Sequence, residues 1–278
     1  MPEPFRVACL QMQTGNDLDA NLETVRAMTR EAAKSGADFV LTPEYALMMD
    51  GSGRTMRERA LAADGAPALA ELRSLAKECG VWLLAGSLTL KSDDQRIANR
   101  SYLLDAGGRV VATYDKIHMF DCVLPDGKVI RESSAYRPGS QAVVADTPWG
   151  KIGLTVCYDL RFPQLYRALA QAGAWYLTIP SSFQRVTGKA HWHTLIKARA
   201  IENACFVFAP AMCGEHPGNR TTYGHTLIVD PWGEVLADGG EAPGIAYARI
   251  EPARIEEVRR MLPCLEHDRA FTLESTSQ

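Results

Sequence analysis

The sequence lacks long hydrophobic runs and a strong net charge. Its longest apolar stretch, residues 81–90, is interrupted by glycine, serine and threonine and is too short to cross a bilayer. The 30 basic and 33 acidic residues leave a formal net charge of −3, which supplies no basic field to hold nucleic acid. We therefore expect a protein that binds neither a membrane nor nucleic acid.

The sequence also has no Cys-x-x-Cys pair. Its seven cysteines are odd in number and scattered, so they indicate neither a disulfide framework nor a zinc knuckle. The first residues, Met-Pro-Glu-Pro-Phe-Arg, lack the charged region, the apolar region and the small-residue cleavage site of a secretory signal. These absences predict a soluble cytoplasmic protein with reduced thiols, no metal and no cofactor.

What the chain does contain is enough apolar material for a large core. It is 278 residues long and 46% hydrophobic, and α/β folds of this length are often one domain. Neither a linker, nor a low-complexity tract, nor a repeat divides it. We expect a single domain over residues 1–278, with a polar tail that frays from about residue 272.

Strands and helices alternate along the sequence, which predicts an α/β fold. A strand over 5–12 is followed by a helix that Asp17 or Asp19 caps and Gly36 ends, and then by a strand over 38–41. Further strands are expected over 81–90, 97–104, 110–114, 141–146, 151–156, 174–179, 205–211, 224–230, 235–238 and 244–250, and helices over 66–79, 163–172, 189–203 and 252–262. Residues 51–64 are interpreted as a flap near the site, and 120–138 as a long functional loop.

Cys157 stands where a buried strand gives way to a helix. Residues 151–156 are mostly apolar, and Pro163 fits the first turn of the helix that follows. The amides and dipole at a helix start favour negative charge, either a thiolate or an oxyanion. A strand-end cysteine considered alone is more often a small packed hydrophobe. The residues that surround it in the fold decide between these interpretations.

Two ionisable residues, Glu44 and Lys116, also come just after predicted strands. In open α/β sheets, this edge is where ligands bind. Glu132 lies in the long loop, which could close over them. A glutamate can take the proton of a thiol, and a lysine can stabilise the oxyanion formed when sulfur attacks a carbonyl or nitrile carbon. Together with Cys157, these residues predict acyl transfer.

These residues occur in motifs that resemble the nitrilase superfamily of carbon-nitrogen hydrolases. The motifs are Thr-Pro-Glu44, Tyr-Asp-Lys116-Ile-His and Gly-Leu-Thr-Val-Cys157-Tyr-Asp-Leu-Arg-Phe-Pro. The resemblance extends from residue 7 to about residue 262. It implies a four-layer α-β-β-α sandwich whose two sheets pack face to face, and dimers formed by apposed helices. We therefore expect a homodimer or a higher homo-oligomer.

The resemblance also implies roles for the candidate residues. In a Glu-Lys-Cys triad, Glu44 is the general base and Cys157 forms a thioester. Lys116 stabilises the tetrahedral intermediate together with the backbone amide of Tyr158. Glu132 resembles the family's second glutamate, which positions the triad lysine and the substrate. These are the expected catalytic residues.

Further motifs resemble the Nit-type amidases. The cysteine motif differs from the Cys-Trp-Glu of true nitrilases and from the asparagine that follows the cysteine in carbamoylases. Segments 180–183, 190–192 and 198–202 are similar to the Nit1-like branch, which hydrolyses an amide of deaminated glutathione. We expect hydrolysis of the terminal amide of a small carboxylic acid, with release of ammonia. The alternatives are a Nit2-like ω-amidase that acts on α-ketoglutaramate and an N-carbamoyl amino acid hydrolase.

Residues near these motifs are candidates for binding the substrate. They are Tyr158, Ser181, Phe183, Thr187 and His191. Arg185 and the 120–138 loop are candidates for holding a substrate carboxylate. The chain departs from the branch pattern at Gln164, at His193 and in that loop, and these departures bear on the substrate rather than on the triad.

Three other interpretations compete with this hypothesis. A papain-like pair would place a histidine opposite Cys157 and would leave the glutamate and the lysine unused. The histidines available for it are His118, His191, His193 and His225. His191 and His193 lie two apart on a helix and point to different faces, so they cannot easily share a metal ion. A catalytically silent scaffold should lack a triad residue, and this chain has all three.

Overall fold

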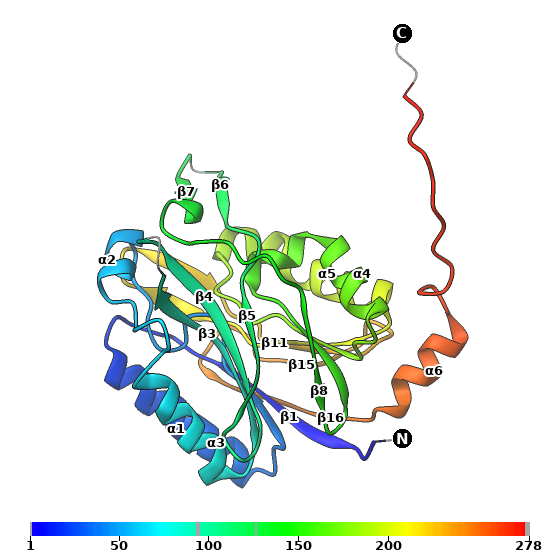
Figure 1. Cartoon of the computed structure of the whole chain (residues 1–278), viewed down its shortest axis with the longest axis horizontal. Coiled ribbons are helices and arrows are strands. Elements are labelled where there is room, and N and C mark those ends of the chain that lie inside the picture. Colours follow the sequence, from blue (N-terminus) through cyan, green and yellow to red (C-terminus); the bar gives the residue numbers. More distant parts are fainter. Residues whose placement is uncertain (1, 93–94, 126, 276–278) are drawn as a thin grey trace.

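The structure, a computed structural model, describes residues 2–92, 95–125 and 127–275. Two six-stranded sheets pack against each other and helices cover their outer faces (Figure 1). The strand orders are β16-β1-β2-β3-β4-β5 in the first sheet and β15-β14-β11-β10-β9-β8 in the second. The predicted four-layer α-β-β-α sandwich is therefore confirmed.

The first sheet contains a parallel centre and antiparallel edges. Its strands are β1 (Phe5–Gln11), β2 (Phe39–Leu41), β3 (Trp82–Lys91), β4 (Ile97–Leu104), β5 (Val110–Asp115) and β16 (Gly244–Ile250). β1, β2 and β3 run parallel, whereas β4, β5 and β16 pair antiparallel with their neighbours. The helices on its outer face are α1 (Leu18–Lys34), which Asp17 caps, and α3 (Ala68–Cys79), with the short α2 (Gly53–Glu58) near one end.

The second sheet repeats this plan. Its strands are β8 (Val143–Thr147), β9 (Gly150–Leu154), β10 (Tyr176–Thr178), β11 (Phe206–Ala209), β14 (Leu227–Val229) and β15 (Val235–Asp238). β9, β10 and β11 run parallel, so their carboxyl ends lie at one edge. The helices on its outer face are α4 (Pro163–Gln171) and α5 (Arg185–Asn203).

The side chains of β1 show how the layers are joined. Phe5, Val7 and Cys9 belong to the core between the two sheets, whereas Ala8 and Leu10 pack towards the outer helices. This alternation follows from the period of two residues in a strand. Because both faces are buried, the strand reads as a continuous apolar run rather than as an alternating pattern.

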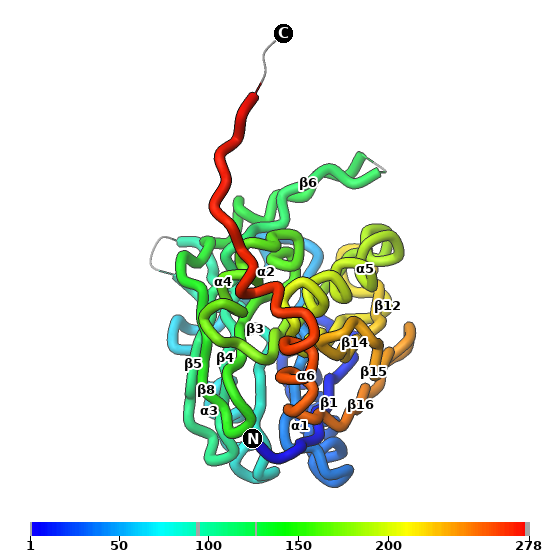
Figure 2. The backbone as a smooth tube through the Cα atoms, turned by 90° about the vertical axis from the view of Figure 1, so that its right-hand side faces the viewer, coloured from blue at the N-terminus to red at the C-terminus, as the bar shows by residue number. Residues whose placement is uncertain are grey.

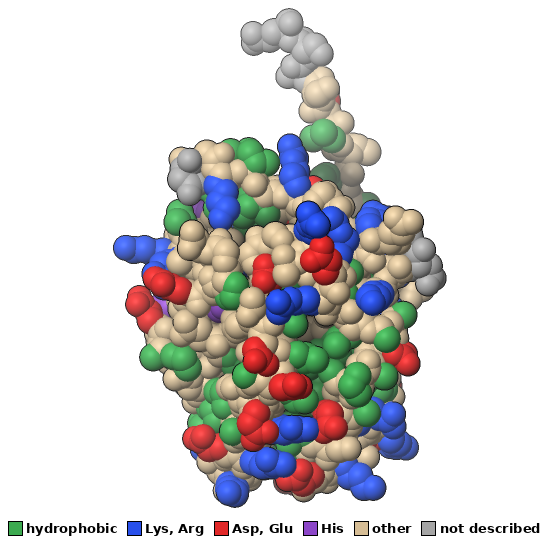
Figure 3. Space-filling model, turned by 90° about the vertical axis from the view of Figure 1, so that its left-hand side faces the viewer, with side chains coloured by type: hydrophobic (Ala, Val, Ile, Leu, Met, Phe, Trp, Pro, Cys, Tyr) green, Lys and Arg blue, Asp and Glu red, His purple; other side chains and the backbone are tan. Residues whose placement is uncertain are grey.

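The outer face over α1 and α3 carries charges of both signs. Figure 3 shows acidic and basic side chains interspersed on the lower half of this face. Ion pairs join the two helices, from Arg26 to Glu71 and from Arg30 to Glu78. The mixture agrees with the small net charge of the sequence.

The structure corrects the sequence interpretation in three segments. The 120–138 loop contains a hairpin of β6 (Asp121–Val123) and β7 (Val129–Arg131), with residue 126 outside the described residues. Val123 and Val129 on these strands are 67% and 56% exposed, which explains why no buried face was visible in the pattern.

A second hairpin, β12 (Cys213–His216) with β13 (Arg220–Tyr223), was also missed. Helix α5 begins at Arg185, four residues before the predicted start at residue 189.

The chain beyond α6 (Ala253–Met261) extends away from the sandwich (Figures 1 and 2). Phe271 and Leu273 are 89% and 90% exposed. Residues 276–278 of the predicted fraying tail lie outside the described residues, and the single domain stays a prediction. Among the described helices, none is both long and apolar enough to span a membrane.

Candidate active site

Glu44, Lys116, Glu132 and Cys157 lie together at one end of the sandwich. Glu44 follows β2, Lys116 follows β5 and Cys157 follows β9, while Glu132 opens the short turn η1 (Glu132–Ser134) after β7. All four line one cavity of about 330 Å³. The structure thus brings together the four residues that the sequence grouped for catalysis.

Lys116 lies between the two carboxylates. Its Nζ is 3.1 Å from Oε1 of Glu44, and 2.8 and 2.9 Å from the two carboxylate oxygens of Glu132. Burial of the side chain disfavours the ammonium ion, but the charges of Glu132 and Glu44 outweigh it and hold the pKa of Lys116 well above its ordinary value. Lys116 is therefore a fixed positive charge, suited to stabilise an oxyanion rather than to act as a base.

Glu44 is almost completely buried, at 1% exposure. Its Oε1 accepts a hydrogen bond from Asn99 Nδ2 at 2.8 Å, and its Oε2 accepts one from the backbone N–H of Ser182 at 2.9 Å. Buried carboxylates need such partners because they have lost their contacts with water. These bonds fix the orientation of both oxygens in the cavity.

Glu132 is held by groups other than the lysine. Its Oε2 accepts a hydrogen bond from the backbone N–H of Phe120 at 2.5 Å, and its Oε1 accepts one from the Tyr45 hydroxyl at 3.0 Å. Tyr45 is itself buried and directly follows Glu44. The carboxylate is therefore anchored independently and can set the position of the Lys116 ammonium group.

Cys157 sits in a constrained turn. It opens the 3-10 helix η2 (Cys157–Arg161) with a φ of +50°, a left-handed conformation that is uncommon for residues other than glycine. Its backbone N–H donates to the carbonyl oxygen of Pro180 at 3.0 Å, just past β10. Such strain is concentrated at functional sites, where the surrounding structure maintains it. Here it places the thiol in the lining of the cavity.

The surroundings of the Cys157 thiol disfavour its charged form. Burial, and then the charge of Glu44, raise its pKa well above the ordinary value, although Lys116 acts in the opposite direction. Both anions that the sequence allowed at this helix start, a thiolate and an oxyanion, stay predictions. Sulfur must lose its proton during the reaction, and Glu44 is the adjacent carboxylate that can accept it.

The four candidate histidines do not serve a papain-like pair. His118 Nδ1 lies 2.7 Å from the fully buried Asp159, and its ring stacks on Phe162 at 3.5 Å. Asp159 also accepts hydrogen bonds from the Tyr114 hydroxyl and from the backbone N–H of Val156. These bonds stabilise the turn that contains Cys157. The other three, His191, His193 and His225, lie outside the lining of the cavity.

Three of the five predicted substrate residues line the cavity, namely Tyr158, Phe183 and Thr187. Ser181 does not, because it is fully buried and its hydroxyl donates to the carbonyl oxygen of Ile179 at 2.9 Å. The next residue, Ser182, lines the cavity in its place.

His191 is the second predicted substrate residue that lies outside the lining. It is on the exposed face of α5, with Nδ1 3.3 Å from the guanidinium group of Arg161. Arg185, at the start of the same helix, also lies outside the lining. Arg185 is about half a turn of helix from Thr187 and therefore points to a different face, whereas His191 is about one turn further along α5. Proximity in sequence was thus a poor guide on this element.

A model of the carbon-nitrogen hydrolase family matches residues 6–260 of this sequence. The chain belongs to the carbon-nitrogen hydrolase family. Two relatives of this carbon-nitrogen hydrolase are deaminated glutathione amidases. The one from Yersinia enterocolitica is 40% identical over 95% of this chain and 92% of its own length, and the one from Homo sapiens is 43% identical over 95% and 82%.

The solved structures agree with this assignment. Nit3 of Saccharomyces cerevisiae, described as a member of branch 10 of the nitrilase superfamily, superposes with a TM-score of 0.85 at 29% identity. The match covers 94% of this chain and 95% of that protein. The resemblance inferred from the motifs is confirmed, and the protein is a hydrolase that acts on amide carbon–nitrogen bonds.

The sequence of this carbon-nitrogen hydrolase did not indicate Arg220 as a candidate site residue. Arg220 opens β13, lines the cavity, and lies over the Tyr45 ring with its guanidinium carbon 5.9 Å from the ring centre. One terminal nitrogen donates to the carbonyl oxygen of Ser182 at 3.0 Å, while the buried Nε has no hydrogen-bond partner among the described residues. The sequence analysis assigned no element to the segment that contains Arg220, and residues 220–223 show no clear apolar pattern.

Proposed function

We propose that this protein is an amidase for a small 2-oxo acid amide, most like deaminated glutathione, and that it acts through a thioester on Cys157. The observation that carries the proposal is the buried contact of Lys116 with both carboxylates, in the same cavity as the Cys157 thiol. The relatives with the name deaminated glutathione amidase cover nearly the whole chain, which supports this substrate.

The first half of the reaction forms the acyl enzyme. As Cys157 sulfur attacks the amide carbon, Glu44 accepts the thiol proton, and the new S–C bond leaves an oxyanion. Lys116 and the backbone amide of Tyr158 stabilise that oxyanion. The carbonyl then re-forms, the C–N bond breaks, and Glu44 returns its proton to the departing nitrogen. The products of this half are a thioester and a free amine.

The second half releases the acid. A water molecule gives a proton to Glu44 while its oxygen attacks the thioester carbon, which forms a second oxyanion beside Lys116. Collapse of this intermediate breaks the C–S bond, and Glu44 returns the proton to the sulfur. The enzyme regains its neutral thiol, the form that the raised pKa of Cys157 favours.

The leaving group separates the candidate substrates. Glutathione is a tripeptide, so removal of its amino group leaves internal amide bonds whose hydrolysis releases a peptide amine. Among the amides, the ammonia expected from the sequence is released from a primary amide such as α-ketoglutaramate, and complete hydrolysis of an N-carbamoyl amino acid or a nitrile also releases it. A panel of deaminated glutathione, α-ketoglutaramate, an N-carbamoyl amino acid and a nitrile, assayed for both ammonia and free amine, distinguishes these activities.

We expect kcat/KM to be highest for deaminated glutathione, at least about 10-fold above that for α-ketoglutaramate. A 10-fold ratio requires the enzyme to bind one transition state about 1.4 kcal/mol more tightly than the other. Preference for the carbamoyl compound or the nitrile would contradict the proposal. A folded sample that hydrolyses none of the four compounds would also contradict the proposal. That result would favour the alternative that the protein is a catalytically silent scaffold.

Arg220 is the candidate partner for the substrate carboxylate. Arg220 lines the cavity that holds the candidate catalytic groups, its Nε has no hydrogen-bond partner among the described residues, and guanidinium forks bind carboxylates in a bidentate manner. Changing Arg220 to Lys should raise KM for a carboxylate-containing amide by roughly 10- to 100-fold, because one charge-assisted hydrogen bond contributes about 1.5–3 kcal/mol. Steady-state kinetics should show little change in kcat.

A neutral aliphatic amide provides the control for this substitution. It lacks the carboxylate, so its kcat/KM should be the same in the wild type and in the Arg220→Lys variant. If both substrates lose activity equally, Arg220 supports the cavity rather than recognising the carboxylate.

Glu132 is proposed to position the lysine. Changing Glu132 to Gln removes the charge that raises the pKa of Lys116 and should lower kcat by roughly 10²- to 10³-fold, as loss of an oxyanion contact does. The remaining activity should also fall off at a lower alkaline pH, because Lys116 then loses its proton more easily. The pH profile of kcat measures this shift, and Glu256→Gln on the exposed face of α6 is the matched control. An unshifted alkaline limb would contradict the positioning role.

We also propose that the protein is a cytoplasmic homodimer and a single domain. All seven cysteines have free thiols, which suits a reducing compartment. An apolar groove between α4, α5 and α6 exposes Ile201, Trp232 and Leu262 by 50%, 48% and 52%. This groove supports the helix-mediated dimer that the family resemblance implies.

A further inference from the structure

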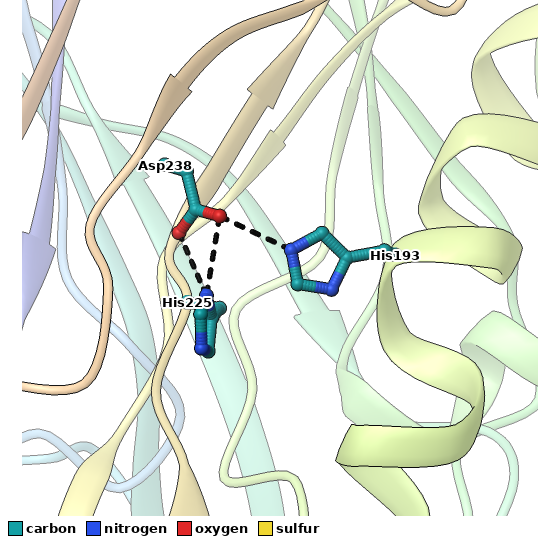
Figure 4. Close-up of side chains that lie close together, drawn as sticks. All are labelled: His193, His225 and Asp238. Atoms are coloured by element: carbon teal, nitrogen blue, oxygen red, sulfur yellow. Dashed lines mark hydrogen bonds and ion pairs between the residues drawn. The ribbon is translucent and has the colours of Figure 1, made fainter.

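A second cluster of ionisable side chains lies at the edge of the second sheet, away from the cavity. Figure 4 shows His193 of α5 and His225, just before β14, pointing towards the carboxylate of Asp238 at the end of β15. His193 Nε2 is 3.1 Å from Oδ2 of Asp238, and His225 Nδ1 is 2.9 and 3.1 Å from its two oxygens. The three potential ligand atoms all lie within 4.8 Å of one another.

The backbone holds His225 in place. It has a left-handed φ of +53°, its N–H donates to the carbonyl oxygen of Gly240 at 2.6 Å, and its own carbonyl oxygen accepts from Trp192 Nε1 at 2.7 Å. Trp192 is fully buried and immediately precedes His193. The two histidines are therefore tied to each other through a rigid part of the core.

The rings are also arranged before any ligand arrives. His225 stacks on Tyr223 with ring centres 4.5 Å apart, and His193 meets both rings edge-on at 5.0 and 5.9 Å. Asp238 Oδ1 accepts a further hydrogen bond from the N–H of Gly240 at 2.9 Å. All three side chains thus have contacts that limit their rotation.

The donor set has the chemistry of a transition-metal site. Two imidazole nitrogens and one carboxylate oxygen are the ligands that Zn²⁺ takes in sites with three protein ligands and one open position. With bonds of about 2.0–2.2 Å, tetrahedral ligands are roughly 3.3 Å apart, slightly more than the three observed nitrogen–oxygen separations of 2.9–3.1 Å.

We propose that His193, His225 and Asp238 form a binding site for a divalent transition-metal ion, with Zn²⁺ as the ion that fits best. The half-exposed carboxylate leaves the fourth position to water. None of the three residues lines the catalytic cavity, so the site is independent of the proposed amidase reaction. Metal bound there would join α5 to the end of β15.

Zinc binding to the full chain tests this inference. Isothermal titration with ZnCl₂ should be done in a Cys157→Ala background, which removes the reactive thiol as a competing ligand. We expect one equivalent to bind and the melting temperature to rise by roughly 5 °C at an excess of about 100 times the dissociation constant. His193→Ala and Asp238→Asn should each weaken zinc binding by about 10-fold or more. Loss of a residue that only contacts a metal ligand typically weakens binding about 10- to 100-fold, and these two residues would contact the metal itself.

His191→Ala is the matched control, because it removes a histidine two residues away on the exposed face of the same helix. It should bind zinc as the parent protein does. Cobalt substitution adds a spectroscopic readout: the site predicts a tetrahedral Co²⁺ spectrum without a thiolate charge-transfer band. Binding that survives His193→Ala, a thiolate band, or absence of saturable binding would each overturn the proposal in favour of a purely hydrogen-bonded cluster.

Discussion

Changing Cys157 to Ala should abolish amide hydrolysis, with a loss in kcat of roughly 10⁵-fold or more. Removal of a catalytic nucleophile eliminates the acyl-enzyme route, and what remains is the small acceleration due to binding and the oxyanion site. The loss should appear in kcat measured with saturating amide, because the substitution leaves Arg220 and the other residues that line the cavity unchanged.

The fold should survive this change. Alanine removes one buried sulfur from a turn that is held by backbone hydrogen bonds, so circular dichroism and the melting temperature should change little. Cys79→Ala, at the end of α3, is the matched control and should keep full activity. Appreciable turnover by a folded Cys157→Ala protein would refute the assignment of the nucleophile.

Changing Glu44 to Gln should lower kcat by roughly 10³- to 10⁴-fold and, at the same time, make the cysteine more reactive towards alkylation. The amide can keep the contact with Ser182 but cannot accept the thiol proton, so turnover falls. Glu44 is also one of the groups that raise the pKa of Cys157. Without its charge, that pKa should fall and the thiolate should form at lower pH.

The sign of the second effect separates two mechanisms. If Glu44 accepts the proton only during attack, the midpoint of iodoacetamide alkylation moves to lower pH in Glu44→Gln. If Glu44 already held a thiolate in the resting enzyme, the same substitution would slow alkylation at neutral pH. Alkylation rates across the pH range, measured by intact-protein mass spectrometry in both proteins, decide between them.

The candidate catalytic residues were predictable from sequence as a group because each follows a recognisable strand. Glu44, Lys116 and Cys157 come after β2, β5 and β9, whose apolar runs are strong signals. The carboxyl ends of the strands then place them at one end of the sandwich. The bounds of β4, β15 and β16 agree with the predicted ranges for the same reason.

Residues on weakly patterned elements were not predictable in this way. Arg220 lies on a short hairpin that buries little, so its segment lacked a strand signal. Ser181 and His191 were grouped with the site by motif proximity, whereas the side chain at each of these positions turns away from the cavity. Orientation at this scale depends on tertiary packing.

The cluster of His193, His225 and Asp238 shows the same limit over a longer distance. The sequence suggested only His191 as a partner for His193, and helical geometry excluded that pair. The structure gives His193 two partners from other elements, His225 and Asp238. A short run of sequence holds no information on a contact between residues 193 and 238, which depends on how α5 packs beside the edge strand.

Rapid acid quenching of the enzyme during turnover, followed by mass spectrometry, tests the central claim most directly. The account predicts a mass gain equal to the acyl part of the substrate, carried by the peptide that contains Cys157 and released by hydroxylamine. The Cys157→Ala protein should show no such adduct. An acyl group on another residue, or full turnover by the variant, would contradict the account.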